Sequence, residues 1–265
     1  MTSRFCAVLG LVLAWTASAV ASPLPPKLPV SWSPPVSSHF ETSAVRTSSP
    51  LVQQAVEQRV RETVTPEMLA HFGLIVYVSK ADVGPWAQRM YVFQKAGDDL
   101  LLLYDWTVST GRETVEAAAN GAELPTTTPS GYYQLDPKRF YEKYRSTQWN
   151  EPMPYAMFFN WINHGVTTGL AIHGTSEKDQ ALLGTRASAG CVRLATENSR
   201  TLFNLIRNNY KGVAPKFAFD KYSNTLMNNG LLVHDQSGNV ALASGYSVLV
   251  YIDEFGGPAL EAQAY

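Results

Sequence analysis

The chain has 265 residues, of which 45% are hydrophobic and only 16% are charged, and its net charge is −1. This length allows one large domain or two small ones. The content of 6 Trp, 13 Tyr and 11 Phe excludes a chain that is disordered throughout. The nearly neutral charge gives no electrostatic reason to bind nucleic acid or an acidic membrane surface, so we expect no nucleic-acid partner.

Residues 1–21 have the pattern of a secretory signal peptide. Arg4 gives a positive start, an apolar run follows over 7–14, and the A-V-A triplet over 19–21 fits a cleavage site before Ser22. The apolar run is shorter than the ~20 residues that span a membrane. An uncleaved N-terminal anchor is the alternative. We expect an exported protein without stable membrane insertion.

Cysteine usage becomes informative once the leader is removed. Cys6 lies in the leader, so the mature chain would keep Cys191 alone and form no intrachain disulfide. A lone thiol in an exported protein is either buried and inert or reactive. The residues that flank Cys191 in the sequence are therefore needed to distinguish these two roles.

The next segments differ in composition. Residues 22–50 hold 7 Pro and 8 Ser, which is typical of an extended tether. Ser49-Pro50 and Thr65-Pro66 each match an N-cap followed by Pro at the first helical position. They predict a short helical segment over 51–73, with one helix over about 51–63 and a second that ends at Gly73. The last residues, 255–265, are expected to form a C-terminal tail.

From Leu74 onward the pattern changes to runs of β-branched and aromatic residues, which favour strands. Strands are expected over 74–79, 89–94, 100–110, 131–135, 155–160, 168–173 and 245–253. A helix is expected over 198–209, directly after Cys191. Residues 136–153 and 211–245 are interpreted as insertions. The sequence therefore predicts a mainly β domain with few helices (α+β) over 74–254.

Several familiar catalytic motifs are absent. The sequence contains no G-x-x-x-x-G-K-[ST] phosphate loop, no G-x-G-x-x-G fingerprint and no H-E-x-x-H zinc motif. No Ser lies three residues before a Lys, which excludes the S-x-x-K arrangement. His173 and Asp179 have no convincing third partner for a metal. We expect neither a metal nor a cofactor.

Two short segments remain that can carry chemistry: Ile172-His173-Gly174-Thr175 and, from Ser188, the run S-A-G-C-V-R-L. A cysteine attacks a carbonyl as a thiolate, and a neighbouring imidazole supplies the base and then protonates the leaving amine. We therefore expect His173 to lower the pKa of Cys191, and N–H groups at the start of the following helix to stabilise an oxyanion. Taken singly, each residue is also compatible with a structural role.

These segments resemble the YkuD-type L,D-transpeptidases, in which H-G-T precedes S-x-G-C-x-R. Thr128-Pro129-Ser130-Gly131 is similar to the upstream TP-x-G segment of that family, Met153-Pro154-Tyr155-Ala156 to its M-P-Y-A stretch, and Leu183-Gly184 to its L-G lead-in. The resemblance covers about residues 74–253. The family often has S-H-G-C, and Ala189 stands here in place of that second His.

The resemblance implies a β-sandwich or barrel-like catalytic domain and an acyl transfer on peptidoglycan. Cys191 would be the nucleophile, His173 the general base and acid, Gly174 the residue whose carbonyl orients the base, and Gly190 an N–H donor to the oxyanion. The reaction would cross-link stem peptides or attach a protein to the wall of a bacterium, in the periplasm or at the cell wall. A hydrolytic L,D-carboxypeptidase or amidase with the same Cys–His pair, and a catalytically silent wall-binding module, are the alternatives.

Substrate contacts are also implied. Arg193 and Ser188 would organise the loop or meet a substrate carboxylate, and Tyr155 and Trp149 would line a lid together with other aromatic residues of the 136–153 insertion. The alternative is that these aromatic side chains are packing residues. Peptidoglycan stem peptides and a wall-anchored acceptor protein are the expected partners.

Cleavage is expected to leave a mature N-terminus near Ser22, because the A-V-A triplet is followed there by the tether. Mass spectrometry of the exported protein measures this directly. A species that retains Met1 in the membrane fraction would support the anchor instead.

Overall fold

A computed structural model describes residues 48–254. The expected signal peptide (1–21), residues 22–47 of the expected tether and the expected tail (255–265) lie outside the described residues. Among residues 48–254, no helix has the length and apolar content to cross a membrane.

Two helices open the described part of the chain, as the two N-cap signals predict. α1 (Pro50–Thr63) begins where the Ser49 side chain accepts the N–H of Val52, and α2 (Pro66–His71) begins where Thr65 accepts the N–H of Met68. The buried residues of α1 recur every four positions, at 52, 56 and 60, so this helix covers a flat apolar surface with one face.

That surface is a five-stranded sheet in the order β3-β2-β1-β17-β6. Its strands are β1 (Leu74–Ser79), β2 (Arg89–Ala96), β3 (Asp99–Thr107), β6 (Gly131–Tyr133) and β17 (Val248–Asp253). β1 pairs parallel with β17, and the other neighbours are antiparallel. All six residues of β1 are buried because helices α1 and α2 cover one face of the sheet and a second layer covers the other.

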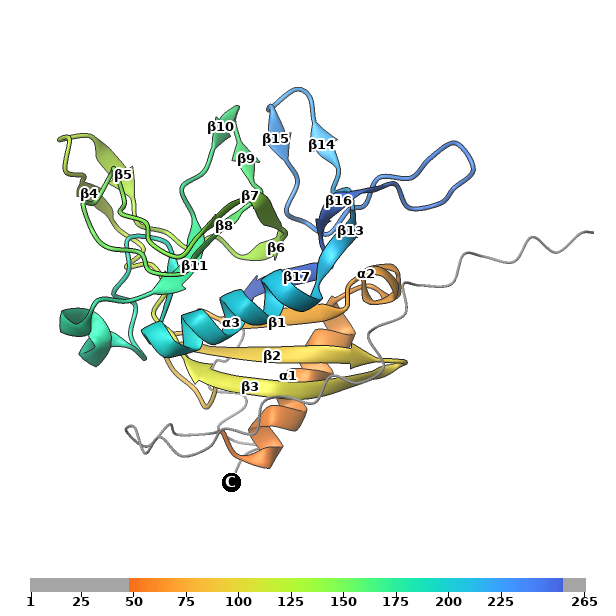
Figure 1. The fold of residues 1–265 in the computed structure, drawn as a ribbon, viewed down its shortest axis with the longest axis horizontal. Coiled ribbons are helices and arrows are strands. Elements are labelled where there is room, and N and C mark those ends of the chain that lie inside the picture. The colour runs from red at the N-terminus through yellow and green to blue at the C-terminus, as the bar shows by residue number, and fades with distance from the viewer. Residues whose placement is uncertain (1–47, 255–265) are drawn as a thin grey trace, which may run out of the picture.

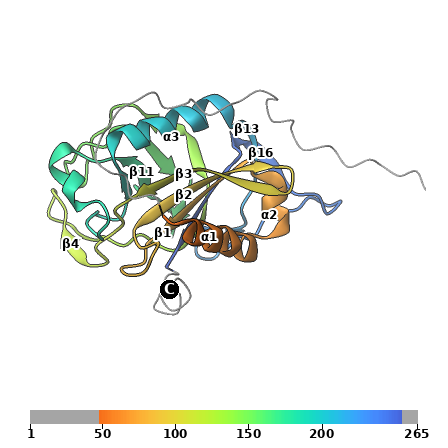
Figure 2. The same ribbon diagram turned by 90° about the horizontal axis from the view of Figure 1, so that it is seen from below.

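The alternation along β1 separates two cores. Leu74, Val76 and Val78 belong to a large cluster that continues into the second sheet, whereas Ile75 and Tyr77 belong to a cluster shared with α1 and α2. Successive side chains of a strand point to opposite faces, so a continuous apolar run is the pattern of a strand buried on both sides. Figure 2 shows α1 and α3 on opposite sides of the sheet.

The second sheet has the order β12-β11-β8-β7. Its strands are β7 (Leu135–Tyr141), β8 (Ala156–Phe159), β11 (Ala171–Gly174) and β12 (Val192–Leu194), and α3 (Thr196–Asn209) packs against it. β11 and β12 are parallel, and the other pairs are antiparallel. The two sheets share one core, so the expected mainly β, sandwich-like fold with few helices is confirmed.

Several hairpins project from this frame, and three of them rise on the same side of the molecule in Figure 1. These three are β4 (Val115–Ala117) with β5 (Glu123–Pro125), β9 (Ile162–Asn163) with β10 (Val166–Thr167), and β14 (Phe219–Asp220) with β15 (Thr225–Leu226). A fourth pair, β13 (Lys211–Pro215) with β16 (Leu242–Tyr246), follows α3, and a 3-10 turn, η1 (Glu177–Leu182), precedes the cysteine.

Two expectations about local structure are wrong. The helix does not follow Cys191 directly, because strand β12 intervenes and α3 begins at Thr196. Residues 136–153 are not wholly an insertion, because 135–141 form β7, the edge strand of the second sheet. β12 is three residues long, too short for a periodic signal, and β7 carries polar residues that face solvent.

Met68→Ala is expected to lower the free energy of unfolding by about 2–5 kcal/mol, because Met68 is fully buried between the helices and the sheet. Leu51→Ala is the matched control on α1. Its side chain is 63% exposed, so we expect a change within about 0.5 kcal/mol. Urea denaturation measures both, and equal losses would contradict this packing of the helices.

Candidate active site

The pairing of β11 with β12 brings the two chemistry-bearing segments together. Ile172 pairs with Val192 and His173 with Arg193 in parallel register, and Cys191 lies one position before β12. Ile172 and Val192 are fully buried in the core, so the flanking residues point to the opposite face. His173 and Cys191 consequently line the same pocket.

The pocket has a volume of about 320 Å³. Its walls come from the β4–β5 hairpin, the segment 146–153, the β9–β10 hairpin and the turn before β12. Lining residues from these four parts include Leu124, Pro125, Trp149, Met153, Val166, Thr167, Ala189 and Arg193. Ala189 contributes a small apolar side chain. The site is thus a mainly apolar pocket with a thiol, an imidazole and a guanidinium on its walls.

His173 is buried, at 4% exposure, and its tautomer follows from one contact. Nδ1 lies 2.8 Å from the carbonyl oxygen of Gly174. A carbonyl only accepts, so Nδ1 carries the proton and Nε2 keeps a lone pair. The hydrogen bond expected at Gly174 is therefore present. Burial lowers the pKa of His173 to about 4, the Gly174 hydrogen bond opposes this, and the nearby charge of Arg193 lowers the pKa further.

Cys191 is half-buried, and its thiol is protonated rather than activated. Sγ lies 3.6 Å from the carbonyl oxygen of Gly169, to which it donates. Burial raises the pKa of Cys191 to about 11, against the opposing effects of a hydrogen bond from the backbone of Ala171 and the charge of Arg193. The pKa of Cys191 is thus raised, and not lowered as expected from a neighbouring His173. Desolvation favours the neutral form of both groups.

The turn before Cys191 is held by side-chain hydrogen bonds. Ser188 is fully buried, donates its hydroxyl to the carbonyl of Cys191, and accepts the N–H of Gly190 at 3.0 Å. Gly190 has φ +110°, and a Cβ there would lie 2.9 Å from the carbonyl oxygen of Thr127. Glycine is therefore required for both conformation and space.

These contacts correct two expectations. Ser188 does not line the pocket, so it organises the loop and does not contact substrate. The N–H of Gly190 is bonded to Ser188, and no helix begins at Cys191, so of the two expected N–H donors to the oxyanion, Gly190 and Cys191, the first is already occupied.

Thr128 is a residue whose role the sequence did not reveal. Its hydroxyl is fully buried, donates to the carbonyl of Gly190 at 2.7 Å, and accepts the N–H of Gly111 at 2.8 Å. It therefore supports the cysteine turn from behind. The TP-x-G segment marked this position, but its distance along the chain from Cys191 concealed the contact.

The remaining expected substrate-binding residues separate into two groups. Arg193 and Trp149 line the pocket, and Arg193 Nη1 lies 3.7 Å from Asp179 and 3.5 Å from the carbonyl oxygen of Ala187. Tyr155 does not line it, because its ring packs edge-on against Phe203 of α3 with centroids 5.8 Å apart. Of the expected aromatic lid, Trp149 lies at the pocket.

The lid tyrosines are packing residues. Tyr141 stacks on Tyr144 with centroids 5.2 Å apart, and Tyr144 meets Phe158 edge-on at 5.0 Å.

Among the described residues, no group of three or more His, Cys, Asp or Glu side chains is placed to hold a metal ion.

A family model for the L,D-transpeptidase catalytic domain (YkuD) matches residues 78–225, which is more than half of the chain. The chain belongs to this family. The match spans β2 to β15 and includes His173, Cys191 and every residue that lines their pocket. The resemblance that the sequence motifs carry is thereby confirmed. No curated protein matches the chain.

Solved L,D-transpeptidases are also similar to this L,D-transpeptidase domain. One from Xylanimonas cellulosilytica is 17% identical over 77% of this chain and 70% of its own, with a TM-score of 0.37. One from Mycobacterium smegmatis is 12% identical over 69% and 59%, with a TM-score of 0.37. One from Stackebrandtia nassauensis is 20% identical over 50% and 50%, with a TM-score of 0.32. The chain thus spans half to 70% of these proteins.

Alkylation of Cys191 by iodoacetamide should be slow in the folded L,D-transpeptidase domain. A thiol pKa of about 11 instead of 9.0 reduces the thiolate fraction at pH 8 about 100-fold relative to the unfolded chain. We expect the logarithm of the rate to rise steadily from pH 7 to 9.5. The measurement uses a Cys6→Ser chain, folded and in urea. A plateau near neutral pH in the folded chain would reveal a pre-formed thiolate instead.

Burial of neutral His173 should make stability depend on pH. The folded-state pKa of about 4 lies below the unfolded value of 6.5, so the unfolded state binds the extra proton. Stability is complete above pH 6.5 and falls as pH drops toward 4, by about 3 kcal/mol for this group. His173→Asn should have a flatter profile in urea titrations between these pH values. Parallel profiles would show that His173 titrates normally.

Proposed function

We propose that the protein is an exported cysteine acyltransferase that acts on peptidoglycan stem peptides as an L,D-transpeptidase. One observation carries the proposal: the thiol of Cys191 and the imidazole of His173 line one pocket, and Gly174 holds the proton on Nδ1, so that Nε2 is free to act as a base. A nucleophile beside an oriented base is the signature of covalent acyl transfer.

The reaction begins from a neutral pair. As Sγ of Cys191 attacks the carbonyl carbon of the L-centred diamino acid in the stem, its proton moves to Nε2 of His173. The carbonyl π electrons move to oxygen and form a tetrahedral oxyanion. When the oxyanion collapses, the C–N bond to the terminal D-Ala breaks, and the His173 proton goes to the departing amine. The product is a thioester on Cys191.

The thiol must first turn toward the base. Its hydrogen bond to the carbonyl of Gly169 is long, at 3.6 Å, so leaving it costs little. The Gly174 hydrogen bond meanwhile stabilises the imidazolium that forms, since it strengthens as the ring becomes positive. Since burial favours the neutral form of both groups, the proton moves to His173 only as Sγ attacks the substrate carbonyl.

Arg193 supplies the positive charge of the pocket. Its guanidinium is largely buried, at 12% side-chain exposure, and its Asp179 partner is 3.7 Å away. A carboxylate of the stem peptide would compete with Asp179 for this guanidinium. Trp149 and Met153 provide apolar walls for the stem.

An acceptor then attacks the thioester carbonyl, and Nε2 of His173, neutral again, takes the proton of the acceptor. When the tetrahedral intermediate collapses, the C–S bond breaks and this proton returns to Sγ of Cys191. An amine of a neighbouring stem gives a cross-link, an amine of a wall-anchored protein attaches that protein, and water gives a carboxypeptidase. The mainly apolar walls favour an amine over water, because they limit water around the thioester. Action on stem peptides also requires export, which agrees with the A-V-A cleavage pattern over 19–21, and the proposed location is the periplasm or the cell wall.

Cys191→Ala should abolish release of D-Ala from a disaccharide tetrapeptide, and His173→Ala should slow thioester formation about 10²–10⁴-fold. Muropeptide analysis measures product, and intact-protein mass spectrometry measures the acyl-enzyme. Unchanged turnover in Cys191→Ala would contradict the mechanism.

His234→Ala is the matched control for the histidine variant. His234 is exposed, pairs with Glu67 at 2.6 Å and does not line the pocket. We expect its turnover to equal that of the wild type. Equal losses in both histidine variants would mean that His173 is not the base. A protein that binds wall material but forms no acyl-enzyme would be the silent wall-binding module.

A further inference from the structure

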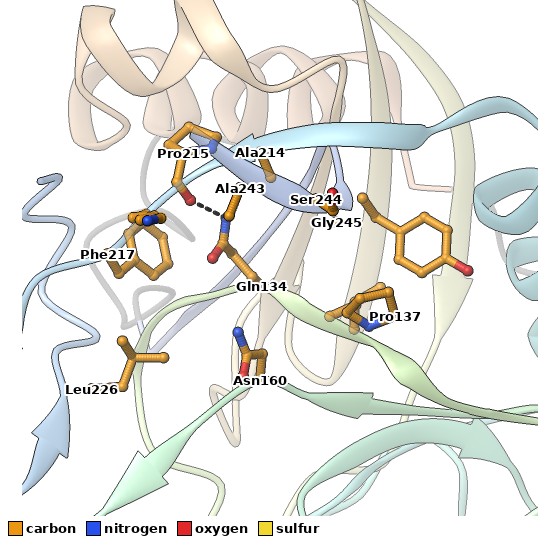
Figure 3. Close-up of a pocket in the computed structure, with 13 residues that line it drawn as sticks. Gln134, Pro137, Asn160, Ala214, Pro215, Phe217, Leu226, Ala243, Ser244 and Gly245 are labelled. Atoms are coloured by element: carbon orange, nitrogen blue, oxygen red, sulfur yellow. Dashed lines mark hydrogen bonds between the residues drawn. The ribbon is translucent and has the colours of Figure 1, made fainter. Parts of the chain in front are cut away.

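A second cavity of about 220 Å³ lies outside the catalytic pocket. It is bounded by β7, by residues 214–217 at the end of β13, and by residues 243–246 of β16 (Figure 3). β7 is the edge strand of its sheet, and β16 pairs with β13 alone within the described part of the chain. The cavity thus lies where two sheets leave a gap between their edges.

Two carboxamides are available inside it. Gln134 is 8% exposed and donates Nε2 to the carbonyl oxygen of Pro215 at 2.7 Å, as Figure 3 shows. Its Oε1 and the whole carboxamide of Asn160 form no hydrogen bond with any described residue. Asn160 is exposed, and an amide presents both donors and acceptors, so both carboxamides can bond a ligand in the cavity. The cavity therefore suits a ligand with hydroxyl or amide groups.

The volume of the cavity and its other lining residues restrict the class of ligand further. A volume of about 220 Å³ is below the ~300–1,000 Å³ of sites for drug-sized ligands, so it fits a single ring. Phe217 and Tyr246 provide aromatic surface, the floor consists of the small residues 243–245, and no acidic residue lines the cavity. Lys216 is the one charged lining residue, which disfavours a cationic ligand.

The cavity is also next to the catalytic pocket. Trp161 lines the catalytic pocket, Leu226 lines the second cavity, and Trp161 Nε1 donates to the carbonyl of Leu226 at 3.0 Å. Asn160 and Trp161 are consecutive in the chain, and each lines one of the two spaces. The two spaces are therefore neighbours, linked by the contact between Trp161 and Leu226.

We propose that this cavity binds one N-acylated sugar ring of the glycan strand whose stem peptide enters the catalytic pocket. The proposal rests on the proposed function for the choice of polymer. The carboxamides of Gln134 and Asn160 would bond the acetamido and hydroxyl groups, and the apolar face of the ring would lie against Phe217 or Tyr246. The sugar contact would position the strand and would not take part in the chemistry.

The test measures binding of a β-1,4-linked N-acetylglucosamine tetramer to the full chain by calorimetry. We expect the wild type to bind it, and to bind the de-acetylated glucosamine tetramer at least tenfold more weakly. Asn160→Leu removes one carboxamide from an exposed position, and Gly245→Leu places a side chain in the cavity. Both should weaken binding at least tenfold.

The controls keep this result interpretable. A Cβ at Gly245 meets only Ala214 Cβ, at 3.5 Å, so the strand tolerates a side chain. Gly212 is the cross-strand partner of Gly245, has nothing within 4 Å of its Cβ position and does not line the cavity. Gly212→Leu should therefore bind like the wild type. Thermal melting checks that each variant folds.

Three outcomes would overturn the proposal: no binding of the acetylated tetramer to the wild type, equal binding by all variants, or binding of a sugar-free tetrapeptide that the same cavity variants abolish. The proposed function is tested separately, by measuring acylation of Cys191 with the tetrapeptide in the wild type. Sugar binding without acylation would leave the cavity standing and defeat the proposed function. Acylation without sugar binding would support the proposed function and overturn the sugar site.

Discussion

The site depends on the parallel pairing of two short strands, β11 and β12. Ile172 and Val192 face each other in this register and are both fully buried, so a slip by one residue would push an apolar side chain into the pocket and the imidazole into the core. The hydrophobic core thereby fixes the position of His173 relative to Cys191.

A second constraint acts on the cysteine turn itself. Ser188 bonds two backbone groups of the turn from within, and Thr128 ties the carbonyl of Gly190 to the N–H of Gly111 from behind. Each of these hydroxyls is fully buried and satisfied on both sides, which makes the turn rigid. Supporting hydrogen bonds of this kind hold a nucleophile in place more precisely than packing alone.

The sequence predicted those features that local chemistry determines. The caps at Ser49 and Thr65 gave the first two helices, and the apolar run from Leu74 gave a strand buried on both faces. The Cys–His pair and the role of Gly174 followed from motifs. The direction in which side chains point could not be predicted from motifs. Tyr155 packs on α3 although it belongs to the M-P-Y-A stretch. The second cavity could not be predicted from the sequence, because five segments that are distant in the chain form it.

Burial of the Cys–His pair favours its neutral form. The thiol pKa of about 11 lies about seven units above the imidazole pKa of about 4, so proton transfer from Cys191 to His173 is strongly unfavourable in the free protein. A neutral thiol reacts slowly with oxidants and stray electrophiles. In the proposed mechanism, the proton therefore moves from Cys191 to His173 as Sγ attacks the carbonyl, because the new C–S bond removes the negative charge from sulfur. Reactivity is then conferred by the bound substrate, and the apolar pocket that suppresses the thiolate also shapes the substrate that the enzyme accepts.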